Sequence, residues 1–242
     1  CVGAIPVKVP EKNLTFNVDA VLSQVTDKTR IVFIANPNNP TGSYIPADEM
    51  ARLRAGLRDD ILLVIDCAYA EFVTRNDYDM GFDLVDAAEN TVVTRTFSKI
   101  YALAALRIGW AYCPVSVADV LNRLRGPFNL STAAQAAGKA AVEDTAHVAA
   151  ARDHNSIWLP WFSDRLNECG LTVYPSAANF VLVRFPEDDT HNSAAAMAFF
   201  GSKGIIPRET AGYGLPDCLR VTIGREDEMR AFADAAKEFM AE

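Results

Sequence analysis

Four short motifs in the first half of the chain carry side chains suited to catalysis. They are the segment NPNNPTG at 36–42, DCAY at 66–69, TFSK at 96–99, and Arg107. Asp66 ends an apolar run, and a carboxylate placed there is costly unless a cation pairs with it. Lys99 follows another apolar run, and a lysine partly withdrawn from water can attack a carbonyl to form a Schiff base. The pair predicts chemistry on a carbonyl compound that also carries a cationic group.

Residues near Asp66 and Lys99 indicate which carbonyl compound they would bind. Ser98 and Arg107 supply a hydroxyl and a guanidinium, which are the donors that a phosphate needs. Asn39 and Tyr69 can donate to a phenolate oxygen. A lysine for an aldehyde, an aspartate for a protonated ring nitrogen and two phosphate donors together describe a cradle for pyridoxal phosphate.

The elements expected around these motifs alternate between strands and helices. Buried strands are predicted for the apolar runs at 31–35, 61–65, 91–95 and 108–112, and a helix for 46–58. Buried strands separated by helices imply a mainly parallel sheet with helices on both faces. Ligands bind beyond the carboxyl ends of such strands, which is where the motifs fall.

The pattern changes after Pro114. Helices are predicted at 116–125, 132–151, 151–168, 193–203 and from 225 onward, and strands at 171–174, 180–185 and 219–223. Pro160 is expected to kink or interrupt the helix at 151–168. We therefore expect a large cofactor-binding domain over 1–115, connecting helices over 116–150 and a smaller α+β domain over 151–242.

Composition narrows the classes of function and the compartment. The chain has 23 Lys and Arg against 31 Asp and Glu, a net charge of −8, which argues against binding nucleic acid or an anionic membrane. Five cysteines with no CxxC pair favour a reducing compartment, the cytoplasm, over a disulfide frame or a metal site. Neither a signal peptide nor a membrane-spanning run is expected. The start at Cys1, without Met, is expected to mark a piece of a longer protein.

The motifs taken together resemble a known family. NPNNPTG at 36–42, DCAY at 66–69, TFSK at 96–99 with ALAALRIGW at 102–110, and CLRVTIG at 218–224 occur in the order typical of class I/II aminotransferases. These are pyridoxal-phosphate enzymes of the aspartate-aminotransferase fold, fold type I. The resemblance covers nearly the whole chain and is greatest to the histidinol-phosphate aminotransferase branch. That finer assignment rests on TRTFSKIYALAALRIGW, the strand ANFVLVRF and the segment GIIPRE.

The resemblance implies a role for each matching residue. Lys99 would form the Schiff base and move the proton between Cα and C4′, and Asp66 would keep the ring nitrogen protonated. The other implied contacts are Tyr69 and Asn39 at the cofactor O3′, Ser98, Arg107 and Thr96 at its phosphate, Arg220 at the substrate α-carboxylate, and Arg208 at the substrate phosphate. Asn39 is also implied as a substrate-binding residue.

The activity implied is amino transfer between L-histidinol phosphate and 2-oxoglutarate in histidine biosynthesis, by a homodimer. Family chains are longer at the N-terminus, so a helix N-terminus for the cofactor phosphate and an aromatic residue for its ring are expected to be missing. Two alternatives share the fold, an aromatic amino acid aminotransferase and a threonine-phosphate decarboxylase. An alternative of another class is a catalytically inactive fragment or a cofactor-binding module.

Each residue also has a structural interpretation. Lys99 alone is typical of a solvated surface lysine, and Asp66 alone of a turn or helix cap. The segment 36–42 is rich in turn-forming residues. Arg220 could pair with an acidic side chain, although a substrate carboxylate is favoured for an arginine within a buried strand. Arg208 is as compatible with a surface ion pair as with a substrate phosphate.

Overall fold

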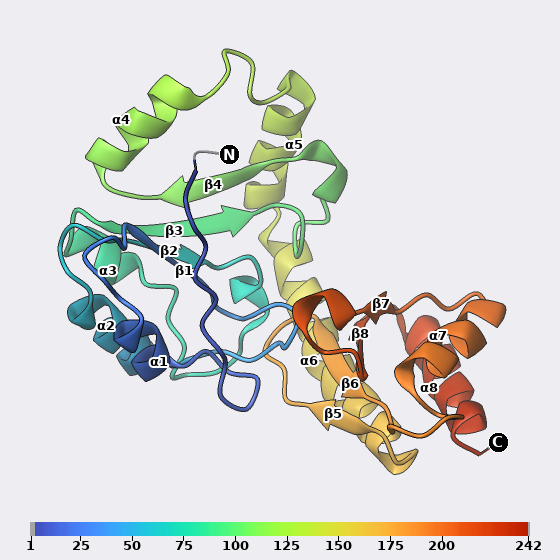
Figure 1. Ribbon diagram of the computed structural model, residues 1–242. Helices are drawn as coiled ribbons and strands as arrows, with labels where there is room; N and C mark the ends of the chain where they lie inside the picture. Colours follow the sequence, from blue (N-terminus) through green and yellow to red (C-terminus); the bar gives the residue numbers. More distant parts are fainter. Residues whose placement is uncertain (1–2, 242) are drawn as a thin grey trace. The chain divides into compact units, whose positions relative to one another are not determined.

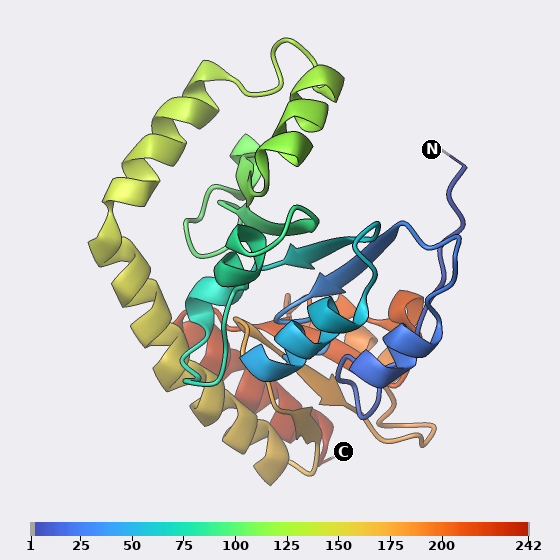
Figure 2. The ribbon, with the colours of Figure 1, turned by 90° about the vertical axis from the view of Figure 1, so that its left-hand side faces the viewer.

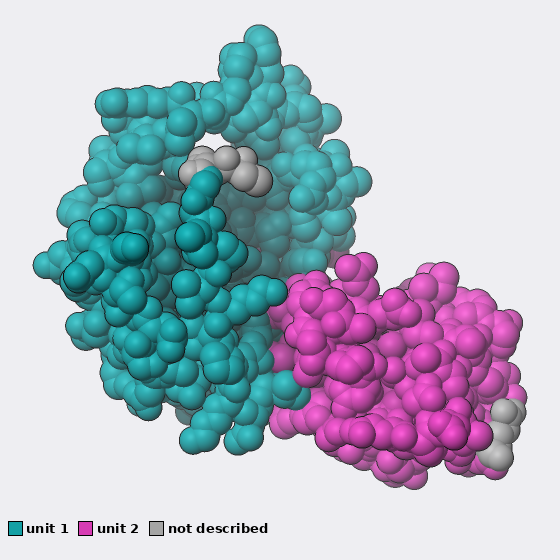
Figure 3. All heavy atoms as spheres, in the orientation of Figure 1, with its two compact units in different colours: residues 1–38, 43–70, 75–145 teal, residues 39–42, 71–74, 146–242 magenta. Residues whose placement is uncertain are grey.

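The computed structural model of the chain describes residues 3–241, so the start at Cys1 lies outside the described residues. The chain divides into two compact units, drawn in teal and magenta in Figure 3. Unit 1 holds the described residues up to Asn38 together with Ser43–Ala70 and Arg75–Thr145. Unit 2 holds Asn39–Gly42, Glu71–Thr74 and the residues from Ala146 onward.

Unit 1 is built on a four-stranded sheet in the order β1-β2-β3-β4 (Figure 1). The strands are β1 (Ile31–Ala35), β2 (Leu62–Asp66), β3 (Thr91–Thr96) and β4 (Gly109–Tyr112). The first three are parallel, so the predicted mainly parallel sheet is confirmed. β4 runs antiparallel to β3, and all four of its residues are exposed. The prediction of a buried fourth strand was wrong, because β4 pairs with β3 alone among the described strands.

Short helices cover one face of this sheet. Alternate strand residues point to the same face, and those on the covered face pack on α1 (Val18–Ser23), α2 (Ala47–Gly56) and α3 (Phe82–Asp86). Figure 2 shows α1 and α2 side by side below the strands. The buried cluster includes Ile34, Leu63, Ile65 and Val93 of the strands with Val18, Val21, Met50, Leu53 and Val85 of the helices. Unit 1 also contains α4 (Val115–Leu124), α5 (Thr132–Glu143) and the 3₁₀ helix Ala104–Leu106.

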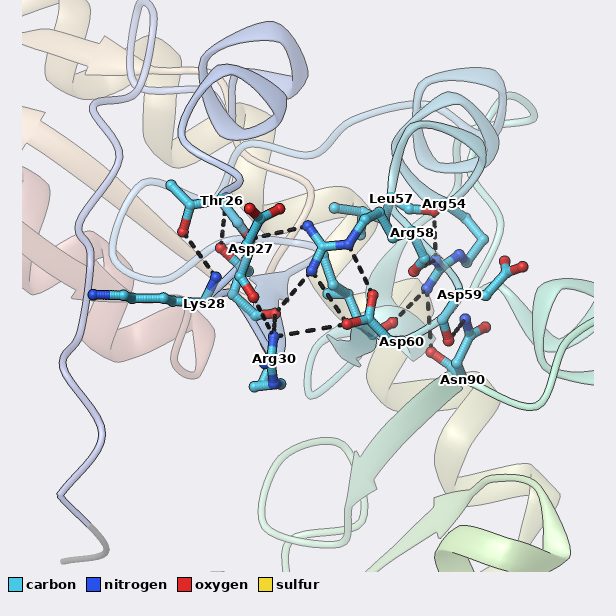
Figure 4. Close-up of polar contacts among 12 residues, drawn as sticks. Thr26, Asp27, Lys28, Arg30, Arg54, Leu57, Arg58, Asp59, Asp60 and Asn90 are labelled. Atoms are coloured by element: carbon cyan, nitrogen blue, oxygen red, sulfur yellow. Dashed lines mark hydrogen bonds and ion pairs between the residues drawn. The ribbon is translucent and has the colours of Figure 1, made fainter.

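A buried arginine lies at the end of unit 1 where β2 and β3 begin (Figure 4). Arg54 lies in α2 and is only 8% exposed. Its Nη1 donates to the carbonyls of Ile61 at 3.0 Å and Asn90 at 3.2 Å, and its Nη2 to those of Leu57 at 3.0 Å and Arg58 at 2.9 Å. Burial lowers the pKa of Arg54. One side chain thus ties the end of α2 to the starts of β2 and β3.

Replacing Arg54 with methionine is expected to lower the free energy of unfolding by about 3 kcal/mol, because buried carbonyls lose their donors. Arg52→Met is the matched control on the same helix. Arg52 pairs with Glu49 and Asp19 at the surface, and its loss is expected to change stability by less than about 1 kcal/mol. Urea unfolding of both variants measures the difference, and equal losses would contradict a structural role special to Arg54.

Unit 2 contains an antiparallel sheet and three helices. The sheet has the order β5-β6-β8-β7, from β5 (Thr172–Tyr174), β6 (Phe180–Arg184), β7 (Arg208–Glu209) and β8 (Cys218–Thr222). The helices are α6 (Thr145–Glu168), α7 (Ser193–Ser202) and α8 (Glu226–Phe239), with a 3₁₀ helix at Ala211–Tyr213. A further 3₁₀ helix, Ala70–Phe72, begins at the last residue of the second segment of unit 1.

The helix α6 differs from its prediction. The expected boundary at 151 lies within α6, and the chain instead breaks between Glu143 and Thr145. Pro160 lies inside α6 and does not interrupt it. A proline inside a helix costs about 3 kcal/mol, but Phe162 and Leu166 beyond it are fully buried, and each such side chain contributes about 1.5–3 kcal/mol. No helix in residues 3–241 is long and apolar enough to cross a membrane.

Alternation along the strands gives the sheet of unit 2 two different faces. Leu219 and Val221 of β8 belong to the apolar cluster formed with α6, α7 and α8. Arg220 lies between them and therefore points to the opposite face, as does Leu182, its partner in β6. The sheet thus separates an apolar face, packed on helices, from a face that carries an arginine.

The cysteines that the structure describes are free. Cys67 and Cys218 are buried, whereas Cys113 and Cys169 are partly exposed. Within residues 3–241, no group of three His, Cys, Asp or Glu side chains lies close enough together to hold a metal ion.

Candidate active site

Asp66 lies at the carboxyl end of β2, where the parallel sheet places it beside Ala35 of β1 and Thr94 of β3. Its Oδ1 accepts a hydrogen bond from the Ala68 N–H at 3.1 Å, so the carboxylate also shapes a turn. The residue is exposed, but the surrounding protein partly desolvates its carboxylate. This desolvation raises the pKa of Asp66, while the Ala68 N–H and the positive charge of Lys99 act in the opposite direction. A carboxylate in this setting gains from a cationic partner.

Lys99 supplies the nearby amine. It follows the end of β3 by three residues, and its Nζ lies 5.0 Å from the ring centroid of Tyr69, which is a cation–π contact. The Tyr69 ring is buried, whereas Lys99 is exposed. No carboxylate of the described chain forms an ion pair with Lys99. The amine is thus oriented by an aromatic ring and is not tied to an acid.

Thr96, Ser98 and Arg107 form a second group beside this lysine. The Ser98 N–H donates to Thr96 Oγ1 at 3.0 Å. Arg107 Nη1 donates to the Ala104 carbonyl at 2.9 Å and, at 3.5 Å, to Ser98 Oγ. Arg107 adopts the left-handed conformation with φ of 52°, which a non-glycine residue rarely takes. Within residues 3–241 it has no acidic partner, so a hydroxyl and a guanidinium are available together for an anion.

Arg220 provides a separate cationic group in unit 2. Its Nη1 donates a hydrogen bond to Asn39 Oδ1, and its Cζ lies 4.8 Å from the ring centroid of Phe180. Its Nε is buried and has no hydrogen-bond partner among the described residues. Buried polar atoms are nearly always bonded, so a free one needs an explanation. The sequence also allowed an ion pair between Arg220 and an acidic side chain. Arg220 forms no such pair with any carboxylate that the structure describes.

Arg208 lies directly opposite Arg220 in the antiparallel register of β7 and β8. Like charges in that position destabilise a sheet unless an anion neutralises them. Arg208 is exposed and forms no ion pair within the described part of the chain. The two arginines therefore present two positive charges to one face of the sheet.

The structure thus groups the predicted residues in two places. Unit 1 brings together Asp66, Tyr69 and Lys99, with Thr96, Ser98 and Arg107 close to Lys99 in the chain. Unit 2 brings together Asn39, Arg220 and Arg208, so Asn39 contacts an arginine of the predicted substrate group. The contact of Asn39 with the cofactor stays a prediction. The sequence did not predict a role for Phe180, whose ring lies under the guanidinium of Arg220. Phe180 precedes Leu182, the strand partner of Arg220, by two residues, and this relation is known only once the strand register is known.

Comparison with known proteins gives the family. The family model of aminotransferase class I and II matches residues 2–235. The chain belongs to the class I and II aminotransferases.

Two curated relatives are named histidinol-phosphate aminotransferase. The relative from Paramagnetospirillum magneticum is 60% identical over 98% of this chain and 66% of its own length. The relative from Rhodospirillum rubrum is 53% identical over 99% of this chain and 65% of its own length. The chain therefore spans just under two thirds of the length of these relatives.

The fold is similar to that of a crystal structure with bound cofactor. Histidinol-phosphate aminotransferase from Sinorhizobium meliloti, in complex with pyridoxal-5'-phosphate, matches with a TM-score of 0.88 and 28% identity. The match covers 97% of this chain and 64% of that one. The fold class expected from the sequence is confirmed.

Proposed function

We propose that this chain binds pyridoxal 5′-phosphate and transfers an amino group between L-histidinol phosphate and 2-oxoglutarate, in histidine biosynthesis. The observation that carries the proposal is the placement of Lys99 against Tyr69, with its charge acting on Asp66, beyond the ends of β2 and β3. The names of the curated relatives and the bound cofactor of the similar crystal structure support it.

The donor set of unit 1 fits this cofactor. Asp66, a carboxylate with a raised pKa, would hold the proton of a pyridine nitrogen. Lys99 would hold the aldehyde carbon in the resting chain and, once the substrate amine has displaced it, would take the proton from the substrate Cα. Arg107, Ser98 and Thr96 would bind the phosphate. When bound, pyridoxal phosphate supplies the carbonyl that accepts the amino group and a ring that accepts the electron pair from Cα.

The arginines of unit 2 support the choice of substrates. L-Histidinol phosphate carries a phosphate and no carboxylate, whereas 2-oxoglutarate carries two carboxylates. Arg220 and Arg208 are opposed across two strands and unpaired with any described acid, so they suit a dianion of either kind. An aromatic amino acid offers a single carboxylate. We therefore favour a phosphorylated amino donor and assign the anion to Arg220 and Arg208, with Asn39 orienting Arg220.

Association and compartment belong to the same proposal. We propose a homodimer, and α4, none of whose residues is buried, supports it. Val115 and Leu124 of α4 and the nearby Phe128 are 85%, 77% and 94% exposed. The free cysteines support a reducing compartment, and we propose the cytoplasm.

The amino donor can be tested directly. We expect the chain, given pyridoxal phosphate and 2-oxoglutarate, to form glutamate from L-histidinol phosphate at least about tenfold faster than from phenylalanine. Two charged hydrogen bonds to the phosphate are worth more than 1.4 kcal/mol, which is a factor of ten. Release of CO₂ from threonine phosphate, faster than glutamate formation, would favour the decarboxylase. Cofactor bound at Lys99 without any amino transfer would favour the cofactor-binding module.

A further inference from the structure

A buried asparagine in α6 interrupts an apolar stripe. Asn155, Phe162 and Leu166 are spaced by seven and four residues and therefore lie on one side of the helix. Phe162 and Leu166 are fully buried, and Asn155 is only 6% exposed. Its Nδ2 donates to the Ala178 carbonyl at 3.1 Å, while its buried Oδ1 has no partner in the described chain. Burying this amide with one oxygen unbonded is unfavourable, so an apolar residue would serve packing better.

The bond from Asn155 fixes a short loop, 176–178, just before β6. Within this loop the Ala178 N–H donates to Ser176 Oγ at 3.1 Å. The Ala177 N–H donates to the carbonyl of Gly42 at 2.8 Å. Gly42 has a φ of +74°, and a Cβ there would come within 2.2 Å of Ser176 Oγ. The loop is thus held by α6 on one side and packs closely on the backbone of Gly42 on the other.

Both neighbours of the Arg220 guanidinium connect to this loop. Gly42 ends the segment Asn39–Gly42, whose first residue accepts the hydrogen bond of Arg220. Ala178 precedes Phe180, whose ring lies under Arg220, by two residues. A shift of the loop would therefore move the amide and the ring that orient the guanidinium.

We infer that Asn155 is a positioning residue for anion binding: through the Ala178 carbonyl it fixes the 176–178 loop and thereby aims Arg220. This inference rests on the proposed function, because it takes Arg220 as the residue that binds the substrate anion. Asn155 itself does not contact the guanidinium in the structure. Its effect is on affinity for the anion.

The test measures binding of succinate, an unreactive dicarboxylate, to the full chain by calorimetry. Asn155→Leu keeps the size of the side chain and removes the donor. We expect about fivefold weaker binding, since one hydrogen bond of about 1 kcal/mol no longer holds the loop. Exchange of the Ala177 amide hydrogen is expected to become faster in the same variant.

Leu166→Ala is the matched control for a purely structural role. It removes a fully buried side chain from the same stripe of α6 and leaves the loop contacts in place. We expect it to lower the urea midpoint more than Asn155→Leu does, with unchanged succinate affinity. Equal weakening of succinate binding in both variants would overturn the positioning role.

A third variant separates this inference from the function on which it rests. Arg220→Ala is expected to abolish succinate binding. If it does, and Asn155→Leu binds like the unchanged chain, the positioning role is wrong and the function of Arg220 stands. If Arg220→Ala binds succinate normally, the anion site itself is wrong, and the inference fails with it.

Discussion

Replacing Lys99 with alanine is expected to abolish covalent attachment of pyridoxal phosphate and to slow amino transfer at least about a thousandfold. Lys99 has two tasks in the proposed reaction, as the nucleophile toward the aldehyde and as the group that moves the Cα proton. Its Nζ is oriented by the Tyr69 ring at 5.0 Å, and its charge acts on Asp66. No other lysine of the described chain combines these two neighbours.

The measurement is the amount of cofactor fixed to the protein by borohydride, mapped by mass spectrometry. The unchanged chain is expected to carry close to one label per chain, on Lys99. Lys139→Ala is the matched control, because Lys139 is an exposed lysine on α5 of the same unit. It is expected to label as the unchanged chain does. Full labelling of Lys99→Ala, or a label spread over surface lysines, would contradict the assignment of Lys99.

The sheet of unit 1 was predictable because its strands are continuous apolar runs between turn residues. β1 begins and ends where the run 31–35 does, and β2 and β3 are displaced by one residue at most. Parallel strands carry their carboxyl ends to one edge, so the positions of Asp66 and Lys99 followed from the strand pattern. The direction and exposure of β4 did not, because a short apolar run does not reveal whether both faces of a strand are covered.

The contacts of unit 2 depend on tertiary structure that local sequence does not show. Asn39 and Arg220 are 181 positions apart in the chain, and no spacing rule relates them. The opposition of Arg208 to Arg220 is fixed by the register of β7, a strand of two residues too short to produce a pattern. Asn155 resembles any polar residue in a long helix until its burial against Ala178 is known.

Replacing Asp66 with asparagine is expected to weaken binding of pyridoxal phosphate more than about tenfold, and yet to leave the cofactor-free chain no less stable at neutral pH. A carboxylate pairs with a protonated ring nitrogen through a charge-assisted hydrogen bond, about twice as strong as a neutral one. The neutral amide of asparagine cannot provide it. Asparagine keeps an oxygen for the Ala68 N–H, so the turn at Asp66 is expected to persist.

The stability effect follows from the raised pKa of Asp66. Desolvation raises this pKa above its ordinary value of 3.8, so the folded chain holds the proton more tightly than the unfolded chain. The resulting stabilisation is fully present below the ordinary value and is lost as pH rises through the raised one. The Asp66→Asn chain lacks this titrating carboxylate. Its stability is therefore expected not to show this loss as pH rises.

Urea midpoints of the cofactor-free chains, measured from about pH 4 to about pH 8, test the sign of this effect. The unchanged chain is expected to lose stability over this range relative to Asp66→Asn, whereas Asp234→Asn, which changes an exposed residue of α8, is expected to follow the unchanged chain. If Asp66→Asn is instead the less stable chain at neutral pH, the carboxylate acts mainly as the cap of its turn. The expected results together mean that the Asp66 carboxylate destabilises the cofactor-free chain and strengthens cofactor binding. This combination is expected of a residue whose role is to bind a cationic ligand.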